Sequence, residues 1–178
     1  MVFHLKNSVG DGIEIFSNDN TIINNFIEPE FEGVVSRNTR SVIKGNTIVN
    51  AERGIRIDSI PDDNQILDNT IISSERSGIF VNGGKRHVIQ GNTINQSGEN
   101  GIEVDSSIDD DDSFISEDVI IKGNSITNSV EFGIEIDSES LNTVVIDNIF
   151  AGNGGDNLLN NGTDTVLAGN VPNLIWAC

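Results

Sequence analysis

The chain of 178 residues contains few residues of several types, and each scarcity narrows the range of possible structures and functions. A single cysteine, Cys178, excludes an intramolecular disulfide and gives no guide to the redox compartment. Proline occurs three times, as expected where interior strands must donate ladder hydrogen bonds. Tyrosine is absent, and aromatic residues make up only 5% of the chain. This composition favours a thin core of stacked aliphatic side chains over an ordinary globular core.

Basic residues are scarce as well, with 10 lysines and arginines against 28 acidic residues and a net charge of −18. Such a surface repels phosphates, so neither nucleic acid nor an anionic membrane is an expected partner. No apolar run approaches the roughly 20 residues that span a bilayer. The first residues have no charged start followed by an apolar run, so no signal peptide is expected in this segment. The acidity itself fits calcium binding, a cationic or neutral ligand, or solubility in high salt.

The chain does contain a short sequence motif that is repeated along its length. Val88–Ile94 reads Val-Ile-Gln-Gly-Asn-Thr-Ile, and the asparagine in its fifth position recurs in seven copies of the frame: Asn25, Asn46, Asn69, Asn92, Asn124, Asn148 and Asn170. Successive asparagines are 21 to 24 residues apart, apart from one step of 32 between Asn92 and Asn124. A period this regular is typical of a solenoid.

A second motif, Gly-Ile-x-Ile, repeats with the same period as the first. Its copies are Gly12–Ile15, Gly54–Ile57, Gly78–Val81, Gly101–Val104 and Gly133–Ile136, with a poorer one at Gly33–Val35. Alternation of apolar residues indicates a short strand with one face inward. Further strands precede and follow each asparagine, so about 22 residues hold three strands and leave no room for a helix. Each repeat must close one coil, and the coils must stack by parallel pairing about 4.8 Å apart.

The two alternating phrases resemble the parallel β-helix repeat of the pectin-lyase-like superfamily over roughly residues 9–172. The resemblance implies an all-β fold, a right-handed parallel β-helix of three sheets and about seven coils, with the asparagines stacked as a ladder. Each side-chain amide has a donor and an acceptor, so stacked asparagines can hydrogen-bond along the axis. The ladder pairs groups that would be costly to bury alone, and we interpret the asparagines as structural.

Residues 1–178 are predicted to form one β-helix domain. No amphipathic helix or polar cap precedes Gly12, so we expect a segment of a longer solenoid or a chain that associates end to end as a homo-oligomer. The long step places an acidic loop at residues 105–118. Its run Asp109–Asp112 offers oxygen ligands for calcium, although it lacks the glycine and closing glutamate of a twelve-residue calcium loop.

The resemblance also implies a function. The superfamily includes pectate and alginate lyases, polygalacturonase-like hydrolases, uronate epimerases, phage tailspikes and surface proteins. Their usual ligand is a polysaccharide on the outer face of the sheet that corresponds to Gly-Ile-x-Ile. The enzymes' active-site signatures are missing, including Asp-His and Arg-x-Pro-x-x-Arg, the Asn-Thr-Asp set and Tyr-Gly-x-Asp-Pro-His. We expect an extracellular or cell-surface module that binds or processes a polysaccharide; the alternative is a non-catalytic structural solenoid segment.

The outward positions of that face supply the candidate site residues. Glu103 and Glu135 fall in adjacent coils and form a candidate catalytic pair, because carboxyl groups about 5 Å apart suit a retaining glycosidase. The candidate ligand-binding residues are Arg56, Phe80, Asp58 and Asn82. Phe80 is predicted to offer a platform for a sugar ring, or else to pack beneath the acidic loop.

Four aspartates are candidate ligands for a calcium ion: Asp105, Asp137, Asp109 and Asp111. Directly opposed like charges are destabilising, so Asp105 beside Asp137 requires a cation, a shared proton or side chains that splay into water. A solvated acidic edge is the alternative to a metal or catalytic site. His87 is the only histidine inside the repeats, and with no evident partner we expect it at the surface.

Overall fold

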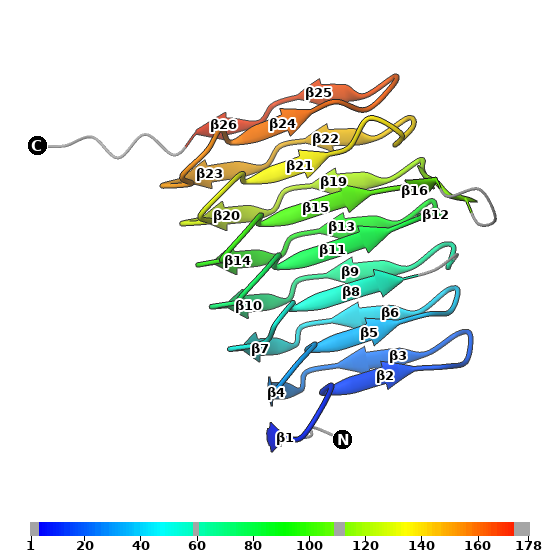
Figure 1. Ribbon diagram of the computed structural model, residues 1–178, viewed down its shortest axis with the longest axis vertical. Helices are drawn as coiled ribbons and strands as arrows, with labels where there is room; N and C mark the ends of the chain where they lie inside the picture. The colour runs from blue at the N-terminus through cyan, green and yellow to red at the C-terminus, as the bar shows by residue number, and fades with distance from the viewer. Residues whose placement is uncertain (1–3, 59–60, 109–112, 173–178) are drawn as a thin grey trace, which may run out of the picture.

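The computed structural model describes residues 4–58, 61–108 and 113–172, which wind into a β-helix of stacked coils (Figure 1). Each coil contributes one strand to each of three parallel sheets. We name these sheets after their first strands. Sheet 1 contains β1 (His4–Ser8), β4 (Phe26–Pro29), β7 (Thr47–Val49), β10 (Thr70–Ile72), β14 (Thr93–Asn95), β20 (Ser125–Thr127), β23 (Ile149–Ala151) and β26 (Val171–Pro172).

Sheet 2 is built from the Gly-Ile-x-Ile strands β2 (Ile13–Ile15), β5 (Val34–Ser36), β8 (Ile55–Asp58), β11 (Ile79–Asn82), β15 (Ile102–Asp105), β21 (Ile134–Ile136) and β24 (Leu158–Asn160). Sheet 3 contains β3 (Thr21–Ile23), β6 (Val42–Lys44), β9 (Gln65–Leu67), β13 (Val88–Gln90), β19 (Ile120–Lys122), β22 (Val144–Ile146) and β25 (Val166–Ala168). The predicted all-β architecture of three sheets and about seven coils is confirmed. The described residues contain no helix that is long and apolar enough to cross a membrane.

The core is a set of aliphatic columns, because each strand points its middle residue or its two ends inward. In sheet 3 the column Ile43, Ile66, Ile89 and Ile121 is fully buried. Where sheet 1 turns into sheet 2, the chain passes so close to its neighbours that only glycine fits. A Cβ on Gly54 would lie 2.4 Å from Ile71 Cγ2 and 2.5 Å from the backbone oxygen of Gly78. The glycine of the repeated phrase therefore marks a close approach between coils.

The predicted asparagine ladder is present along the turn between sheets 3 and 1. The Oδ1 atom of Asn92 accepts from the backbone nitrogen of Asn69 at 2.9 Å and from its Nδ2 at 3.0 Å. Asn92 Nδ2 in turn donates to the backbone oxygen of Ile66 at 2.9 Å and to Asn124 Oδ1 at 3.0 Å. The same pattern runs from Asn25 to Asn170. Each amide thus satisfies buried groups on both neighbouring coils.

His87 is fully buried, so the prediction of a surface histidine is wrong. It stands in a second polar column, where Ser41 N donates to Asn64 Oδ1 at 2.8 Å and Asn64 N donates to His87 Nδ1 at 3.3 Å. Burial lowers the pKa of His87 to about 4, and a neutral ring is what an accepting Nδ1 requires. The histidine replaces asparagine as a coil-to-coil acceptor.

The 32-residue repeat between Asn92 and Asn124 contains an insertion, whose residues form two short strand pairs. Strands β16 (Ser107–Ile108) and β17 (Ser113–Phe114) form an antiparallel hairpin, and β12 (Gly84–Lys85) pairs in parallel with β18 (Ser116–Glu117). Ser116 fixes the base of this insertion, because its nitrogen donates to Ser106 Oγ at 3.0 Å and its hydroxyl donates to the Asp105 oxygen at 2.7 Å. Asp109 and Asp111 lie outside the described residues.

Replacing Asn92 by Leu should destabilise the fold by roughly 2–4 kcal/mol, because the Asn69 amide groups lose their acceptor inside a buried turn. Asn170 is only half-buried at the last rung, so Asn170→Leu should cost much less. Denaturant unfolding of the two variants measures both losses. Equal losses would show that the ladder does not carry the stability assigned to it.

Candidate functional site

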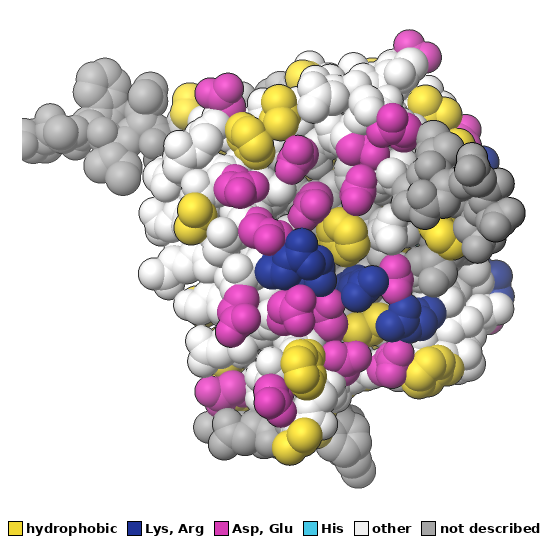
Figure 2. Space-filling view, in the orientation of Figure 1, with side chains coloured by type: hydrophobic (Ala, Val, Ile, Leu, Met, Phe, Trp, Pro, Cys, Tyr) yellow, Lys and Arg dark blue, Asp and Glu magenta, His cyan; other side chains and the backbone are white. Residues whose placement is uncertain are grey.

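The outer face of sheet 2 carries most of the chemistry predicted from the sequence. Neighbouring strands align in one register, which places Arg56 beside Phe80, Phe80 beside Glu103, and Glu103 beside Glu135. The predicted juxtaposition of Glu103 and Glu135 is therefore confirmed. Figure 2 shows this face, with basic side chains grouped among acidic ones.

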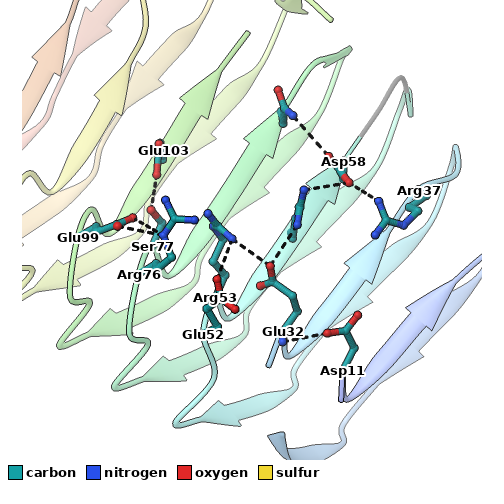
Figure 3. A network of polar contacts seen from close by, with 12 residues as sticks. Asp11, Glu32, Arg37, Glu52, Arg53, Asp58, Arg76, Ser77, Glu99 and Glu103 are labelled. Atoms are coloured by element: carbon teal, nitrogen blue, oxygen red, sulfur yellow. Dashed lines mark hydrogen bonds and ion pairs between the residues drawn. The ribbon is translucent and has the colours of Figure 1, made fainter. Parts of the chain in front are cut away.

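Asp58 joins three of the residues on this face. Its Oδ2 atom lies 3.1 Å from Arg56 Nη2 and also pairs with Arg37 Nη1, while its Oδ1 accepts from Asn82 Nδ2 at 3.4 Å. Arg37 Nε reaches across to Glu14 Oε1 at 3.0 Å, and Figure 3 shows the pairing of Arg37 with Asp58. Three of the four predicted ligand-binding residues, Arg56, Asp58 and Asn82, thus lie together in one network. Arg37 was not singled out from the sequence.

Phe80 does not form the open platform predicted for it. Its side chain is only 8% exposed, although it lies on the outer face as expected. The reason is Arg53, whose Cζ lies 4.8 Å from the centre of the Phe80 ring in a cation–π contact. Arg53 comes from the preceding coil, immediately before Gly54. Val35, which lies beside Arg56 in the same outward column, is also fully buried.

Glu32 holds the arginines of this face together. Its Oε1 atom lies 3.0 Å from Arg53 Nη1 and 3.4 Å from Arg56 Nη1, and its backbone nitrogen donates to Asp11 Oδ1 at 3.1 Å (Figure 3). Burial raises the pKa of Glu32 to about 7 against the opposing charge of Arg56. The contact with Arg53 also favours the ionised carboxylate.

Glu32 and Arg53 both occupy the position just before the repeated glycine, and this position was not considered in the sequence. A signal was present there, because a charged residue precedes glycine in both Glu32-Gly33 and Arg53-Gly54. Glu32 Oε2 and Arg53 Nε are buried and have no hydrogen-bond partner among the described residues. The network is therefore not fully satisfied from within.

Each of the two candidate catalytic carboxyl groups is held by a donor from the preceding coil. Ser77 Oγ donates to Glu103 Oε2, and Asn100 Nδ2 donates to Glu135 Oε2 at 2.7 Å. Burial raises the pKa of Glu103 above its usual range, and the nearby Glu135 acts in the same direction. A carboxyl group with a raised pKa retains its proton longer and is suited to general acid catalysis.

Asp105 and Asp137 meet at the end of the same face. The backbone nitrogen of Ser106 donates to Asp105 Oδ1 and to Asp137 Oδ2, both at 2.9 Å. The backbone nitrogen of Ser140 donates a hydrogen bond to Asp137 Oδ1 at 2.9 Å. Burial and, to a lesser extent, the adjacent Asp105 raise the pKa of Asp137 to about 6, although these donors act in the opposite direction. These donors favour ionised carboxylates whereas burial favours a proton on Asp137, so a shared proton stays a prediction for this pair.

Calcium binding by these aspartates stays a prediction. Within the described residues, no group of three or more histidine, cysteine, aspartate or glutamate side chains is placed to hold a metal ion. Two carboxyl groups alone give few of the 6–8 oxygen ligands that calcium takes. Backbone oxygens, water or further side chains would have to complete the shell.

A shallow groove of about 350 Å³ lies away from these residues, at the turns that lead from sheet 1 to sheet 2. It is lined by uncharged residues from three coils, among them Gln96, Ser97 and Asn128. None of the residues predicted to form the site lines it.

Solved structures with the same architecture include alginate epimerases and a phage tailspike domain. A double mutant of the periplasmic alginate epimerase AlgG matches 94% of this chain and 44% of its own, at 14% identity and a TM-score of 0.78. The enzymatically active domain of the bacteriophage CBA120 tailspike protein 2 matches 86% of this chain and 24% of its own, at 16% identity and a TM-score of 0.69. The A-module of the mannuronan C-5 epimerase AlgE4 from Azotobacter vinelandii matches 98% and 55%, at 16% identity and a TM-score of 0.68.

The chain spans about half or less of the length of these proteins, and identities this low establish the shared fold alone. No curated protein sequence is similar enough to match the chain. A family model described as the right-handed β-helix region matches residues 11–171, which is nearly the whole sequence. The coils, the ladder and this match together show that the chain belongs to the right-handed β-helix family.

Proposed function

We propose that the outer face of sheet 2 binds a polysaccharide, and that the module acts outside the cell or at its surface. The observation that carries the proposal is the polar strip on this face, in which arginines, carboxyl groups and side-chain amides from successive coils lie in register along the axis. An extended polymer could contact several coils at once. Similar structures include alginate epimerases, which supports a polysaccharide as the ligand.

Arg56 is the group best placed to contact such a polymer. It lies at the middle of the strip, its side chain is 28% exposed, and it pairs with both Glu32 and Asp58. A guanidinium binds sugar hydroxyls and, with planar geometry, carboxylates. Arg37 and Arg56 thus offer guanidinium groups to an acidic polysaccharide on a chain of net charge −18, while their partners Glu14, Glu32 and Asp58 balance the local charge.

If the module is catalytic, Glu103 is proposed as the general acid and Glu135 as its partner base or nucleophile. The raised pKa of Glu103 and the separate donors to the two carboxyl groups support different roles for them. The missing enzyme signatures support the alternative, a structural solenoid segment that binds no sugar.

Replacing Arg56 by Gln should weaken binding to an acidic polysaccharide about tenfold, because a charge-assisted hydrogen bond is worth roughly 1.5–3 kcal/mol. Arg40→Gln is the matched control, since Arg40 pairs with Asp19 at 2.7 Å on an exposed turn outside this face. Affinity electrophoresis or calorimetry against acidic and neutral polysaccharides gives the readout. If neither polymer class binds the parent protein, the structural-segment alternative is correct.

Glu103→Gln should abolish turnover of a polysaccharide that binds, while affinity changes little, since the amide still accepts from Ser77. Product release from the bound polymer, measured for Glu103→Gln and Glu135→Gln beside the parent, separates catalysis from binding. Binding with no turnover in the parent would remove the catalytic role and leave a binding module.

The Asp105–Asp137 pair generates a pH prediction. Its raised pKa means that Asp137 stabilises the folded state below about pH 3.8, and that this contribution is lost as pH rises to about 6. Glu32 acts in the same direction between about pH 4.5 and 7. The melting temperature should fall over this range, and Asp137→Asn should flatten the part below pH 6. An unchanged profile in the variant would contradict a shared proton.

Calcium, proposed at the same pair, should replace the proton once both carboxyl groups are ionised. Calcium should therefore raise the melting temperature more at about pH 8 than at about pH 5, and magnesium should do less because it holds its waters. The double variant Asp105→Asn, Asp137→Asn should lose most of the rise. An equal rise of the melting temperature in variant and parent would show that calcium does not bind at this pair.

A further inference from the structure

The outer face of sheet 3 carries an apolar strip that no part of the proposed site uses. Val88, Ile120, Val144 and Val166 lie side by side on four successive strands, β13, β19, β22 and β25. Ile146 and Ala168 continue the strip in the next outward column. Ile120 is 39% exposed and Val166 is 54% exposed, so the strip meets solvent.

The charge of this sheet differs from that of the rest of the chain. Its seven strands contain two lysines, Lys44 and Lys122, and not one of the 28 acidic residues. Sheet 2, by contrast, places Glu14, Glu103 and Glu135 at the centres of its strands. On a chain of net charge −18, sheet 3 is a face that a second copy can approach without meeting opposed carboxylates.

We propose that the strip on sheet 3 is a self-association surface, at which two copies pack side by side with their strips face to face. A flat, regular strip is self-complementary, as the shared patch of a two-fold dimer must be. Burying the branched aliphatic side chains supplies the driving force. Lys122 has no ion pair within the described residues and lies next to Ile146, with the exposed Asp147 just beyond, so a cation and a carboxylate are both available at the rim.

The size of the strip sets the strength of the association. Its four strands of three residues cover roughly 200 Å², well below the ~800 Å² that each partner buries in a standard interface. The flanking turns add area, but the dimer should be weak and reversible. Because each copy carries a large negative charge, added salt should strengthen the association by screening the repulsion. An interface held by ion pairs would respond in the opposite way.

Sedimentation analysis over a wide range of protein and salt concentrations tests the proposal. The parent protein should form dimers at high concentration, more so in high salt, and Val144→Glu should abolish them by placing an unpaired carboxylate in the strip. The control is Ile149→Glu, which changes an exposed aliphatic residue of the same coil on sheet 1 and should leave dimerisation unchanged.

Gln65→Glu provides a second variant, because it adds a charge beside Val88 in the same column without removing an apolar side chain. It should weaken the dimer at least several-fold even if Val144→Glu folds poorly. A parent protein that stays monomeric at every concentration would overturn the proposal and leave the strip to a different partner. Dimers that persist in both sheet 3 variants would also overturn it, and would favour the end-to-end association predicted from the uncapped first coil.

Discussion

Axial register between coils is the constraint on which the rest of this structure depends. Parallel strands fix the distance between equivalent residues at about 4.8 Å, and the asparagine ladder locks the turn so that no coil can slip relative to its neighbours. A slip of one residue would turn every inward isoleucine outward. The close approach of Gly54 to Ile71 and Gly78 enforces the same register at another corner. The columns of the core and of the outer faces are both consequences of this one constraint.

The chemistry of the outer faces follows from the same constraint, because each outward side chain lies beside the side chain at the equivalent position of the next coil. On sheet 2 this brings carboxyl groups together, and donors from the preceding coil bind them: Ser77 for Glu103, Asn100 for Glu135 and the Ser106 amide for Asp137. The arginines of the lower coils neutralise Glu14, Glu32 and Asp58 by diagonal contacts. Perturbed acids gathered on one face are the feature that most favours a functional role there.

The sequence was sufficient to predict the fold because every repeated position has one environment. The asparagine, the glycine and the alternating isoleucines each indicate one local structure: a ladder turn, a close approach between coils and a strand. Because the motif occurs seven times, few other folds are compatible with it. The same register predicted that Glu103 would lie beside Glu135. It did not predict that Arg53 is the residue that covers Phe80, because Arg53 occupies a position whose residue type changes from coil to coil. His87 was misplaced for a related reason: its partner is the backbone of Asn64, and a backbone donor leaves no mark in the sequence.

The central claim is that the ladder amides hold the coils in register, and hydrogen exchange of the backbone tests it most directly. The amide nitrogens of Asn46, Asn69, Asn92 and Asn124 each donate to the next asparagine side chain at 2.9 Å. They should exchange only through global unfolding, with protection falling toward the rung at Asn148 near the last coil. Exchange of the central amides as fast as that of an exposed turn amide, such as that of Glu139, would contradict the account.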